Sequence, residues 1–567
     1  VGTYQNAGHK IMAEIRASGS GATSGQRGSS ISMFTKVNGT ATIQERMRIK
    51  SSGSIYSVNS IQGTYFGQDA GNPASVTGVG NTSIGYATGQ ALTSGYQNVS
   101  VGRSANEKLT TGYNNVSVGT NAGYNNVDGL QNTYIGTAAG YTSPGQNYNT
   151  FVGYESGHNN TANENTAVGR LSLHQNTTGQ YNTAIGMQSL ANNTDQDSLT
   201  ALGYRAGYFW TAGDENTFIG YQSGFGTAAA STGYENTFVG SLTGGSSSGI
   251  TGVRNTALGR YNLFNLTSGD DNVAIGHQSM ITLTTGNFNV AVGKDTMASY
   301  TGSKNTAIGY AAGKSINSDG DNVFVGYNAG KLRTAGIDNT AVGSFSQYGG
   351  TAGSNPQGCC NSSFGFATLH NISVGVQNTA LGRQAGYSIT NGNNNTLVGH
   401  NTALSMVGGY DNTCIGSAAG DILTSGNNNT CIGYDSDTPS NSSTNTVVLG
   451  NTAISSLRCQ VQTISALSDE RDKTNIKDSE YGLNIIDSLR PVTFDWKQRD
   501  GNRDGLKDLG FIAQDLQKVD DKNLNLVDDE DPEKLVAAYG RLIPVLVKSI
   551  QELTAKVEML EKNCKCK

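Results

Sequence analysis

The chain has 567 residues, of which 76 are glycine and 7 are proline, and only 14% are charged. This composition is unlike that of a globular enzyme, and a net charge of −6 over this length is unlike that of a charged disordered polymer. The small charge also gives no electrostatic basis for a nucleic-acid partner. Since no apolar run approaches the ~20 residues of a membrane-spanning helix, we expect no membrane insertion.

Residues 1–62 are predicted to form an N-terminal β connector. Segments with β propensity at 10–16, 29–37 and 40–50 are separated by turns rich in glycine and serine. The stretch at 44–53 reads QERMRIKSSG, and it resembles a segment that often precedes the repeats and chaperone of phage and algal-virus fibre proteins. That resemblance implies a virion attachment protein as the partner at this end of the chain.

A repeat with the core Asn-x-x-aliphatic-Gly fills residues 63–450. Most copies start 17 residues after the previous one, and we expect loop insertions in the three longer intervals, 216–236, 236–255 and 339–361. Leu199 takes the place of the asparagine in one copy. The asparagines that start the other copies are Asn81, Asn98, Asn115, Asn132, Asn149, Asn165, Asn182, Asn216, Asn236, Asn255, Asn272, Asn289, Asn305, Asn322, Asn339, Asn361, Asn378, Asn395, Asn412 and Asn429.

The position before each repeat glycine is apolar in every copy, as in Ile84, Val101 and Ile135, and we predict that this column forms the core. One short strand is expected per repeat, with the glycine allowing a bend. Because no copy can bury an apolar face alone, the predicted fold class is mainly β, a β-solenoid or β-roll in which the asparagines form a ladder at the turns. About 22 coils at ~4.8 Å would make a rod on the order of 100 Å long.

The repeats resemble the head repeats of trimeric bacterial adhesins, which share an Asn-x-x-x-Ile-Gly core at a shorter period, and the repeats of viral fibre proteins. Both resemblances imply a homotrimer. The tyrosines that follow the glycines, Tyr86, Tyr154, Tyr221 and Tyr327, either stack on sugars or pack between coils or chains. The acidic residues of the repeats are scattered, so the pair of carboxylates that glycoside hydrolysis needs is not apparent.

The seven cysteines do not predict a metal site. They lack the paired spacing of zinc ligands, and the chain has only 6 histidines. Cys359 and Cys360 are adjacent, whereas Cys414 and Cys431 fall at equivalent places in successive repeats, where neighbouring strands would bring them near each other. We expect thiols rather than metal ligands, and no cofactor.

The stretch from Asp500 to Gly505 matches the start of a calcium-binding loop. Phe511, however, stands where such a loop needs a bidentate glutamate. We therefore favour a hairpin turn between strands at 494–496 and 511–513 over a metal site.

The composition changes abruptly between Ile464 and Lys477. The sequence before this stretch is rich in Gly, Asn and Thr, and the sequence after it is dense in Asp, Lys, Glu and Leu, as at a domain boundary. We therefore expect a connector at 451–467 and a separate C-terminal domain at 468–567.

Three motifs of the C-terminal domain occur in the order found in a known family. They are SDERDKTNI at 468–476, LRPVTFDWK at 489–497 and GFIAQDL at 510–516. They resemble the C-terminal intramolecular chaperone of phage tail spikes and fibres, a self-cleaving serine peptidase domain. The resemblance implies a small α+β domain that drives homotrimerisation and is then released.

The same resemblance implies a Ser-Lys dyad that turns over once, with Ser468 as the nucleophile, Lys473 as the general base and the bond from Leu467 to Ser468 as the cleavage site. A lysine serves as a base if burial or nearby cations favour its neutral form. Residues five apart share no face of a helix or strand, so a turn or a neighbouring chain must bring the two together. Arg471 either polarises the scissile carbonyl or holds a carboxylate, and Asp472 departs from the apolar residue common in the family.

A helix is predicted from 533 to 562, with a break near Leu542 because Pro544 interrupts the helical pattern. Its apolar residues recur at alternating intervals of four and three, which is the seam of a coiled coil and needs partner helices. The seam residues are Leu546, Ile550, Leu553, Val557 and Leu560. A three-stranded coiled coil fits the resemblance.

The sequence thus favours a fibre or spike on the virion surface that attaches to a host receptor, which we expect to be a glycan. A cell-surface trimeric adhesin and a glycan-depolymerising tail spike are the alternatives. An adhesin needs a membrane anchor at its end, where this sequence predicts a coiled coil. A depolymerase would release oligosaccharides from a host polysaccharide, and beyond self-cleavage we expect no such activity.

Overall fold

The computed structural model contains two compact units, Val1–Ile337 and Asp338–Lys567, and each is described by itself. The described residues are 13–20, 28–36, 43–49, 55–57, 63–71, 76–226, 231–245, 248–317, 320–349, 357–454, 456–458, 460, 468–497, 504–520, 524–529, 532–533 and 535–565. Several predicted segments lie wholly or partly outside these ranges. They are much of the expected loop insertions, most of the loop at 500–505 that resembles a calcium site, and residues 461–467 of the connector.

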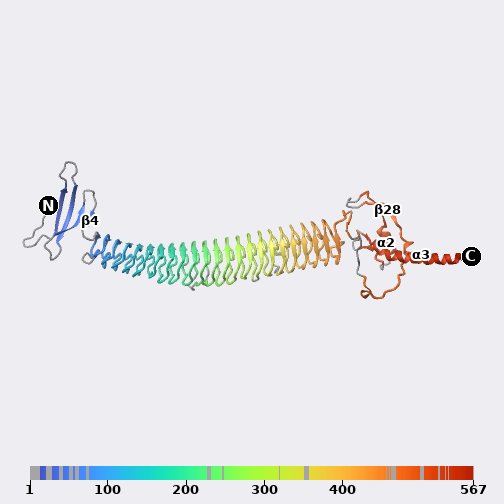
Figure 1. Cartoon of the computed structure of the whole chain (residues 1–567), viewed down its shortest axis with the longest axis horizontal. Helices are drawn as coiled ribbons and strands as arrows, with labels where there is room; N and C mark the ends of the chain where they lie inside the picture. Colours follow the sequence, from blue (N-terminus) through green and yellow to red (C-terminus); the bar gives the residue numbers. More distant parts are fainter. Residues whose placement is uncertain are drawn as a thin grey trace, which may run out of the picture. The chain divides into compact units, whose positions relative to one another are not determined.

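An antiparallel sheet with the strand order β1-β2-β3-β4 forms the start of the first unit (Figure 1). Its strands are β1 (Ala13–Ser20), β2 (Gly28–Lys36), β3 (Ile43–Ile49) and β4 (Ile55–Ser57). The register shifts opposite Met33 and Phe34, which face Met47 and Glu45, so Arg46 is the extra residue of a β-bulge in β3. The three predicted β segments are present with boundaries moved by a few residues, and β4 is additional.

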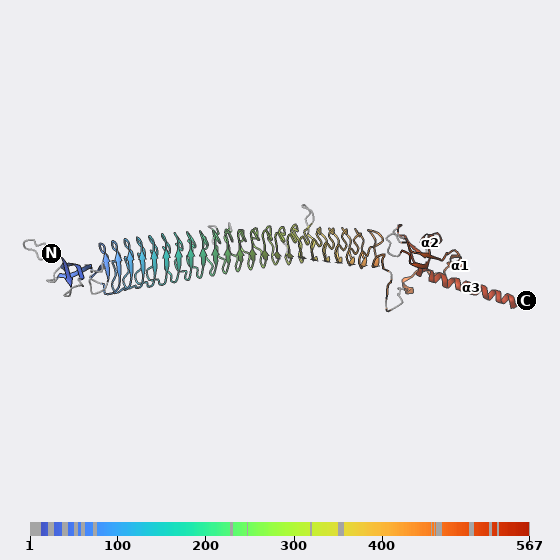
Figure 2. The same ribbon diagram turned by 90° about the horizontal axis from the view of Figure 1, so that it is seen from above.

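Each repeat contributes one three-residue strand that pairs in parallel with the strand of the next repeat, as in Thr256↔Val273 and Val273↔Val290. Figures 1 and 2 show the strands of successive coils side by side. The β-solenoid with a 17-residue period is therefore confirmed. In the first unit the strands are β5 (Thr64–Phe66), β6 (Thr82–Ile84), β7 (Val99–Val101), β8 (Val116–Val118), β9 (Thr133–Ile135), β10 (Thr150–Val152), β11 (Thr166–Val168), β12 (Thr183–Ile185), β13 (Thr200–Leu202), β14 (Thr217–Ile219), β15 (Thr237–Val239), β16 (Thr256–Leu258), β17 (Val273–Ile275), β18 (Val290–Val292), β19 (Thr306–Ile308) and β20 (Val323–Val325). In the second unit they are β21 (Thr340–Val342), β22 (Ser362–Phe364), β23 (Thr379–Leu381), β24 (Thr396–Val398), β25 (Thr413–Ile415), β26 (Thr430–Ile432) and β27 (Val447–Leu449).

The buried column of the solenoid lies one residue earlier than predicted. In β17, Ala274 is fully buried, whereas Val273 and Ile275 on either side face outward and stay partly exposed. Side chains alternate between the two faces of a strand, so the buried asparagine and the central strand residue share the inner face. The prediction that the column of Ile84 and Ile135 forms the core is therefore wrong, because this column lies on the outer face of the sheet.

A second buried column contributes to the interior. It contains the alanine before the glycine of the Tyr-x-Ala-Gly ending, as in Ala206 and Ala312. Larger side chains such as Leu283 and Leu266 form a further buried column four residues later in the repeat. In the second unit, Cys414 and Cys431 belong to the same apolar cluster; they are register partners on β25 and β26, and both are free thiols. Each buried methylene group contributes about 0.8 kcal/mol, so the coils stabilise one another through this narrow core.

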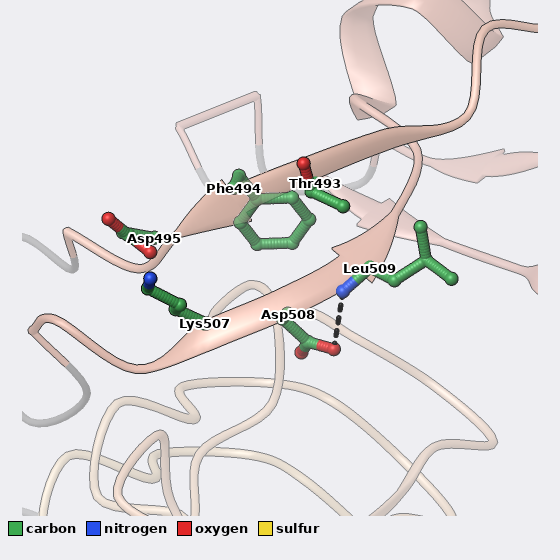
Figure 3. A pocket seen from close by; sticks show the side chains of 6 residues that line it. All are labelled: Thr493, Phe494, Asp495, Lys507, Asp508 and Leu509. Carbon is green, nitrogen blue, oxygen red and sulfur yellow. Dashed lines mark hydrogen bonds between the residues drawn. The ribbon is translucent and has the colours of Figure 1, made fainter.

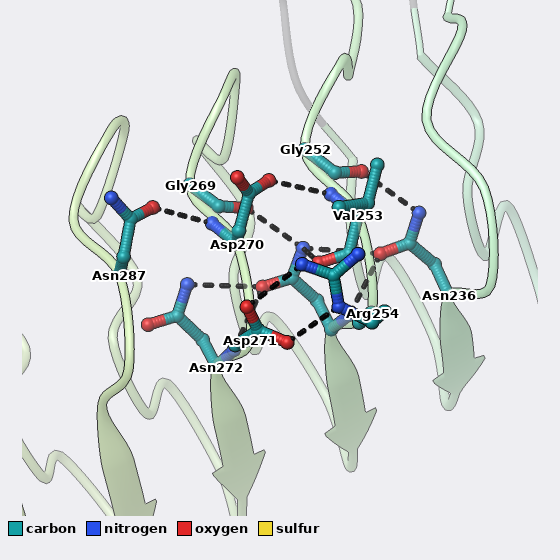
Figure 4. Close-up of polar contacts among 10 residues, drawn as sticks. Asn236, Gly252, Val253, Arg254, Gly269, Asp270, Asp271, Asn272 and Asn287 are labelled. Carbon is teal, nitrogen blue, oxygen red and sulfur yellow. Dashed lines mark hydrogen bonds and ion pairs between the residues drawn. The ribbon is translucent and has the colours of Figure 1, made fainter.

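The asparagine that opens each repeat belongs to a hydrogen-bond ladder through the buried side of the turns, part of which is drawn in Figure 4. The Asn272 side-chain oxygen accepts from the backbone N–H of Asn289 at 3.1 Å and from its side-chain N–H at 2.9 Å. The Asn272 amide donates to Asn255 Oδ1 at 3.0 Å and to the Gly286 carbonyl at 2.8 Å. This fully buried polar side chain is thus satisfied, and the predicted ladder is confirmed.

The glycine after each strand is required by a close approach between coils. Gly276 has a φ of 134°, and a Cβ there would lie 2.3 Å from the carbonyl oxygen of Gly293 in the next coil. A side chain at this position would therefore be strained and would also collide with backbone. The glycine column and the asparagine ladder together fix how closely neighbouring coils stack.

Residues 468–565 form short helices and strands around a small core. The core side chains are Leu516, Leu524, Leu526, Leu542 and Val545. The elements are η1 (Glu470–Asp472), α1 (Leu483–Ile486), β28 (Val492–Asp495), β29 (Lys507–Gly510), α2 (Ala513–Val519), β30 (Val527–Asp528), β31 (Val536–Ala537), η2 (Tyr539–Arg541) and α3 (Leu542–Lys565). Among the described residues, no helix is long and apolar enough to cross a membrane.

Two boundaries in this part of the chain differ from the prediction. The second hairpin strand is β29 rather than 511–513, because the Phe511 N–H leaves the ladder for the Tyr539 hydroxyl at 3.1 Å and α2 begins at Ala513. The last helix begins at Leu542 rather than at 533, since β31 pairs with β30 before it. Pro544 lies in the first turn of α3, where a helix tolerates proline, so Pro544 does not break α3, and the helix begins at Leu542 instead of being interrupted there.

Replacing Asn272 by alanine should loosen the coils beside it. The change removes the buried partners of the Asn289 N–H and the Gly286 carbonyl, at about 1–3 kcal/mol for each group left unpaired. Hydrogen–deuterium exchange should show the Asn289 amide exchanging at least ~10-fold faster. The control Asn391→Ala removes an exposed bond from the Thr390 hydroxyl and should leave exchange unchanged. Equal protection in both variants would contradict a stabilising role for the ladder.

The last coils of the second unit should lose stability as the pH rises from about 4 to about 6. Burial, followed by the neighbouring Asp421 carboxylate, raises the pKa of Asp437 from 3.8 to about 6. The folded state therefore holds this proton more tightly than the unfolded state, so the stabilisation is complete below the lower pKa and lost through the higher one. Asp437→Asn should remove this component and raise the melting temperature near pH 7.5, whereas Asp411→Asn, on the exposed face, should not. Identical pH profiles of melting for wild type and Asp437→Asn would refute this assignment.

Candidate functional site

A tight turn shapes the chain directly after Ser468. Asp469 caps the 3-10 helix η1 by accepting a hydrogen bond from the Arg471 N–H at 2.9 Å. The Asp472 N–H donates to the Asp469 carbonyl at 3.2 Å, and the Lys473 N–H donates to the Glu470 carbonyl at 3.1 Å. The turn reverses the chain, so that two residues five positions apart come to lie side by side.

Ser468 and Lys473, the two predicted members of the dyad, are in direct contact. The distance from Lys473 Nζ to Ser468 Oγ is 2.5 Å, and the distance from Nζ to the Ser468 carbonyl oxygen is 3.2 Å. A neutral amine at this position can take the hydroxyl proton without any movement of the backbone. Leu467, on the other side of the predicted cleavage site, lies outside the described residues.

Arg471 is engaged by a carboxylate of its own turn. Arg471 Nη2 lies 2.6 Å from Asp469 Oδ2, and this interaction lowers the pKa of the Asp469 carboxyl. Of the two roles considered for Arg471, the structure shows the carboxylate contact. Asp472 is exposed, and within the described part of the chain it forms no ion pair with Lys473.

The dyad is exposed to solvent in the single chain. Ser468, Lys473 and all of residues 470–480 are exposed. Lysine acts as a base in its neutral form, which burial favours and water does not. The geometry for proton transfer is therefore present in one chain, while the environment that would favour it is not.

The seam residues of α3 are likewise exposed. Leu546, Ile550, Leu553, Val557 and Leu560 are 45–64% accessible, although Val545 and Ser549 on the other face are buried. An aliphatic row of this kind is costly in water, at roughly 25 cal/mol per Å² of apolar surface. The row is the surface by which α3 can bind partner helices.

Two hollows in the C-terminal part were not predicted from the sequence. The first, of about 640 Å³, lies along the hairpin of β28 and β29, where Figure 3 shows Phe494 and the register partners Asp495 and Lys507. The second, of about 440 Å³, lies between residues 478–479 and the start of α3 and is mostly apolar. Each hollow lies between segments that are separate in the sequence, so no sequence motif predicts it. Neither hollow contains the dyad.

The tyrosines beside the solenoid glycines pack against neighbouring coils. Tyr221 stacks on Tyr204 with ring centroids 5.4 Å apart, and Tyr327 stacks on Tyr310 at 5.2 Å. Arg170 lies over the Tyr154 ring at 5.8 Å. One face of each of these rings is therefore occupied, which supports packing between coils over sugar stacking. Among the described residues, no group of three or more His, Cys, Asp or Glu side chains is arranged to hold a metal ion.

The C-terminal part of the chain matches a known protein family. Residues 468–525 match the model of the family described as chaperone of endosialidase, and the match begins at Ser468. No curated protein matches the chain, and no solved structure matches it. The C-terminal segment is therefore similar to an intramolecular chaperone, and a β-solenoid of 17-residue repeats followed by this segment fits a phage tail fibre with a C-terminal chaperone.

Proposed function

We propose that this chain is a virion fibre or spike that forms a homotrimer and attaches the virion to its host. The observation that carries the proposal is the contact of Ser468 with Lys473 at the first residue of the chaperone-like segment. A chaperone-like segment after a long β-solenoid is consistent with a fibre whose chains require a chaperone to assemble. We infer a host receptor, with a glycan as the expected class, and a virion attachment protein at the N-terminal end.

The proposed cleavage is a transfer of the acyl group from nitrogen to oxygen. The neutral amine of Lys473 takes the Ser468 Oγ proton, and Oγ attacks the carbonyl carbon of Leu467. The bond to the Ser468 nitrogen breaks, this nitrogen receives the proton from Lys473, and an ester joins Leu467 to Oγ. Water then hydrolyses the ester, which leaves Ser468 as the first residue of the released domain.

The exposure of the dyad couples this cleavage to assembly. In a single chain, water keeps the lysine amine solvated, because residues 470–480 are all exposed. Partner chains that cover the turn would remove this water and favour the neutral amine. Cleavage therefore follows trimerisation, and an unassembled chain keeps its chaperone.

Two exposed apolar rows support a homotrimer. One is the seam of α3, and the other is the outer column of the solenoid strands, in which Leu202, Leu258 and Leu381 are about half exposed. The outer column repeats once per coil, so a second copy of the same chain has the matching period. Both rows would be buried between copies, one at the C-terminal end and one along the shaft.

Ser468→Ala and Lys473→Met should each abolish self-cleavage. A denaturing gel of freshly expressed wild type should show two pieces, residues 1–467 and 468–567, whereas each variant should remain one chain. The matched controls Ser479→Ala and Lys477→Met replace an exposed serine and an exposed lysine of the same segment, and they should be cut like wild type. Wild type that remains uncut, or a Ser468→Ala variant that is cut, would contradict the proposed autoproteolysis.

Ile550→Asp should separate the trimer of the full chain. The charge falls in the middle of the α3 seam, where a buried unpaired carboxylate costs several kcal/mol. Light scattering of the uncleaved Ser468→Ala chain should give a trimer mass, and the added Ile550→Asp should give a monomer mass. Met559→Asp, which is 64% exposed but outside the seam, serves as the control and should stay trimeric. A trimer that tolerates Ile550→Asp would contradict the role of this seam.

A further inference from the structure

Cys359 and Cys360 lie on the surface of a solenoid turn, directly before Asn361 of the ladder. Cys360 is exposed and Cys359 is half-buried. Their Sγ atoms are 2.8 Å apart, which is within about 1 Å of the length of a disulfide bond. Two free thiols at this distance on an accessible surface can be joined in a disulfide when an oxidant takes up their two electrons.

The solenoid holds the two side chains in this arrangement. Cys360 has a φ of 62°, and the residue at the same place of other coils has nearly the same value, as in Gln377 at 59° and Asn394 at 57°. The Cys359 carbonyl accepts from the Gln377 N–H at 3.2 Å and from the Asn361 side chain at 3.0 Å. The backbone of the pair is therefore set by its neighbours in the stack.

A hydrogen bond joins the two thiols. The Cys360 thiol donates its hydrogen to Cys359 Sγ, and this bond raises the pKa of Cys360 to about 11. Burial and the charges around it, including Asp338, act in the same direction. The two sulfurs therefore form a hydrogen-bonded pair on the surface of the coil.

We propose that Cys359 and Cys360 form a redox-active vicinal dithiol, which a low-molecular-weight disulfide such as oxidised glutathione converts into an intramolecular disulfide. The thiolate of one cysteine attacks one sulfur of oxidised glutathione, which forms a mixed disulfide and releases one glutathione thiolate. The second cysteine then loses its proton to solvent and attacks the sulfur of the first, which releases the second glutathione. Two cysteines are oxidised and one glutathione disulfide is reduced. The product is an eight-membered ring that includes the peptide bond between the two residues.

The proximity of the thiols favours ring closure over a lasting mixed disulfide. A reaction within one turn has a much higher effective concentration than a second encounter with glutathione. Disulfides persist in oxidising surroundings, such as those outside cells. Cys414 and Cys431 provide an internal contrast, because both are fully buried in the same unit and no dissolved oxidant reaches them.

Mass spectrometry of the intact protein after treatment with oxidised glutathione, followed by alkylation and tryptic digestion, tests the proposal. The peptide 334–383 contains Cys359 and Cys360 as its only cysteines, and the peptide 384–458 contains Cys414 and Cys431. In wild type, the first peptide should lose two hydrogen atoms and carry no alkyl group or glutathione. The second peptide should be alkylated twice after denaturation.

Two variants separate the steps of the reaction. Cys360→Ser should accumulate one glutathione on Cys359, and Cys359→Ser should accumulate one glutathione on Cys360, since the second thiol is missing in each variant. A wild-type pair that stays alkylatable, that retains glutathione or that links two chains on a non-reducing gel would overturn the intramolecular disulfide.

Discussion

The stacking of the solenoid depends on a buried asparagine amide, absent only where Leu199 replaces it among the copies from Asn81 to Asn429, and on a glycine after the strand. The asparagine side chain bonds the coil before it and the coil after it, as Asn272 does with Asn255 and Asn289. The glycine lets the next carbonyl approach to a distance that no Cβ allows. Because both constraints recur along the solenoid, equivalent side chains of all coils fall into columns. The apolar core, the stacked tyrosines and the outer aliphatic row are consequences of this alignment.

The period and the fold of the repeat region follow from the sequence, but the side of the strand that is buried does not. The aliphatic residue before the glycine is the most apolar of its repeat, which favours it as core. The asparagine is buried by hydrogen bonds rather than by its hydrophobicity, and alternation from it places the central strand residue inside, whether it is small like Ala274 or large like Phe218. Leu199 illustrates the same point, since its backbone N–H still bonds Asn182 Oδ1 at 2.9 Å. A pattern of apolar residues alone contains no sign of such a ladder.

For the dyad too, the sequence predicts one part of the site and only the structure shows the rest. The resemblance names Ser468 and Lys473, and the structure supplies the reason that a spacing of five works, which is the 3-10 turn capped by Asp469. The helix boundary at Leu542 and the position of β29 depend on contacts distant in sequence, such as the bond from Phe511 to Tyr539. Local propensity cannot reveal these contacts. Solvent exposure of the dyad is also hidden from the sequence, because it depends on what covers the turn.

A solenoid of nearly identical coils has a physical need for an external guide to its register. In the proposed trimer, sliding one chain by a whole repeat would match the same outer columns again, so the shaft itself distinguishes poorly between registers. The longer intervals at 216–236, 236–255 and 339–361 break this symmetry only locally. The seam of α3 spans two heptads and, in contrast, does not repeat along the shaft. A coiled coil that forms first, near a dyad that becomes covered only in the assembled state, would set the register before the covalent link to the chaperone is cut. In the proposed sequence of events, cutting off this guide would leave a folded shaft that persists kinetically, since the chains would have lost the segment that aligned them.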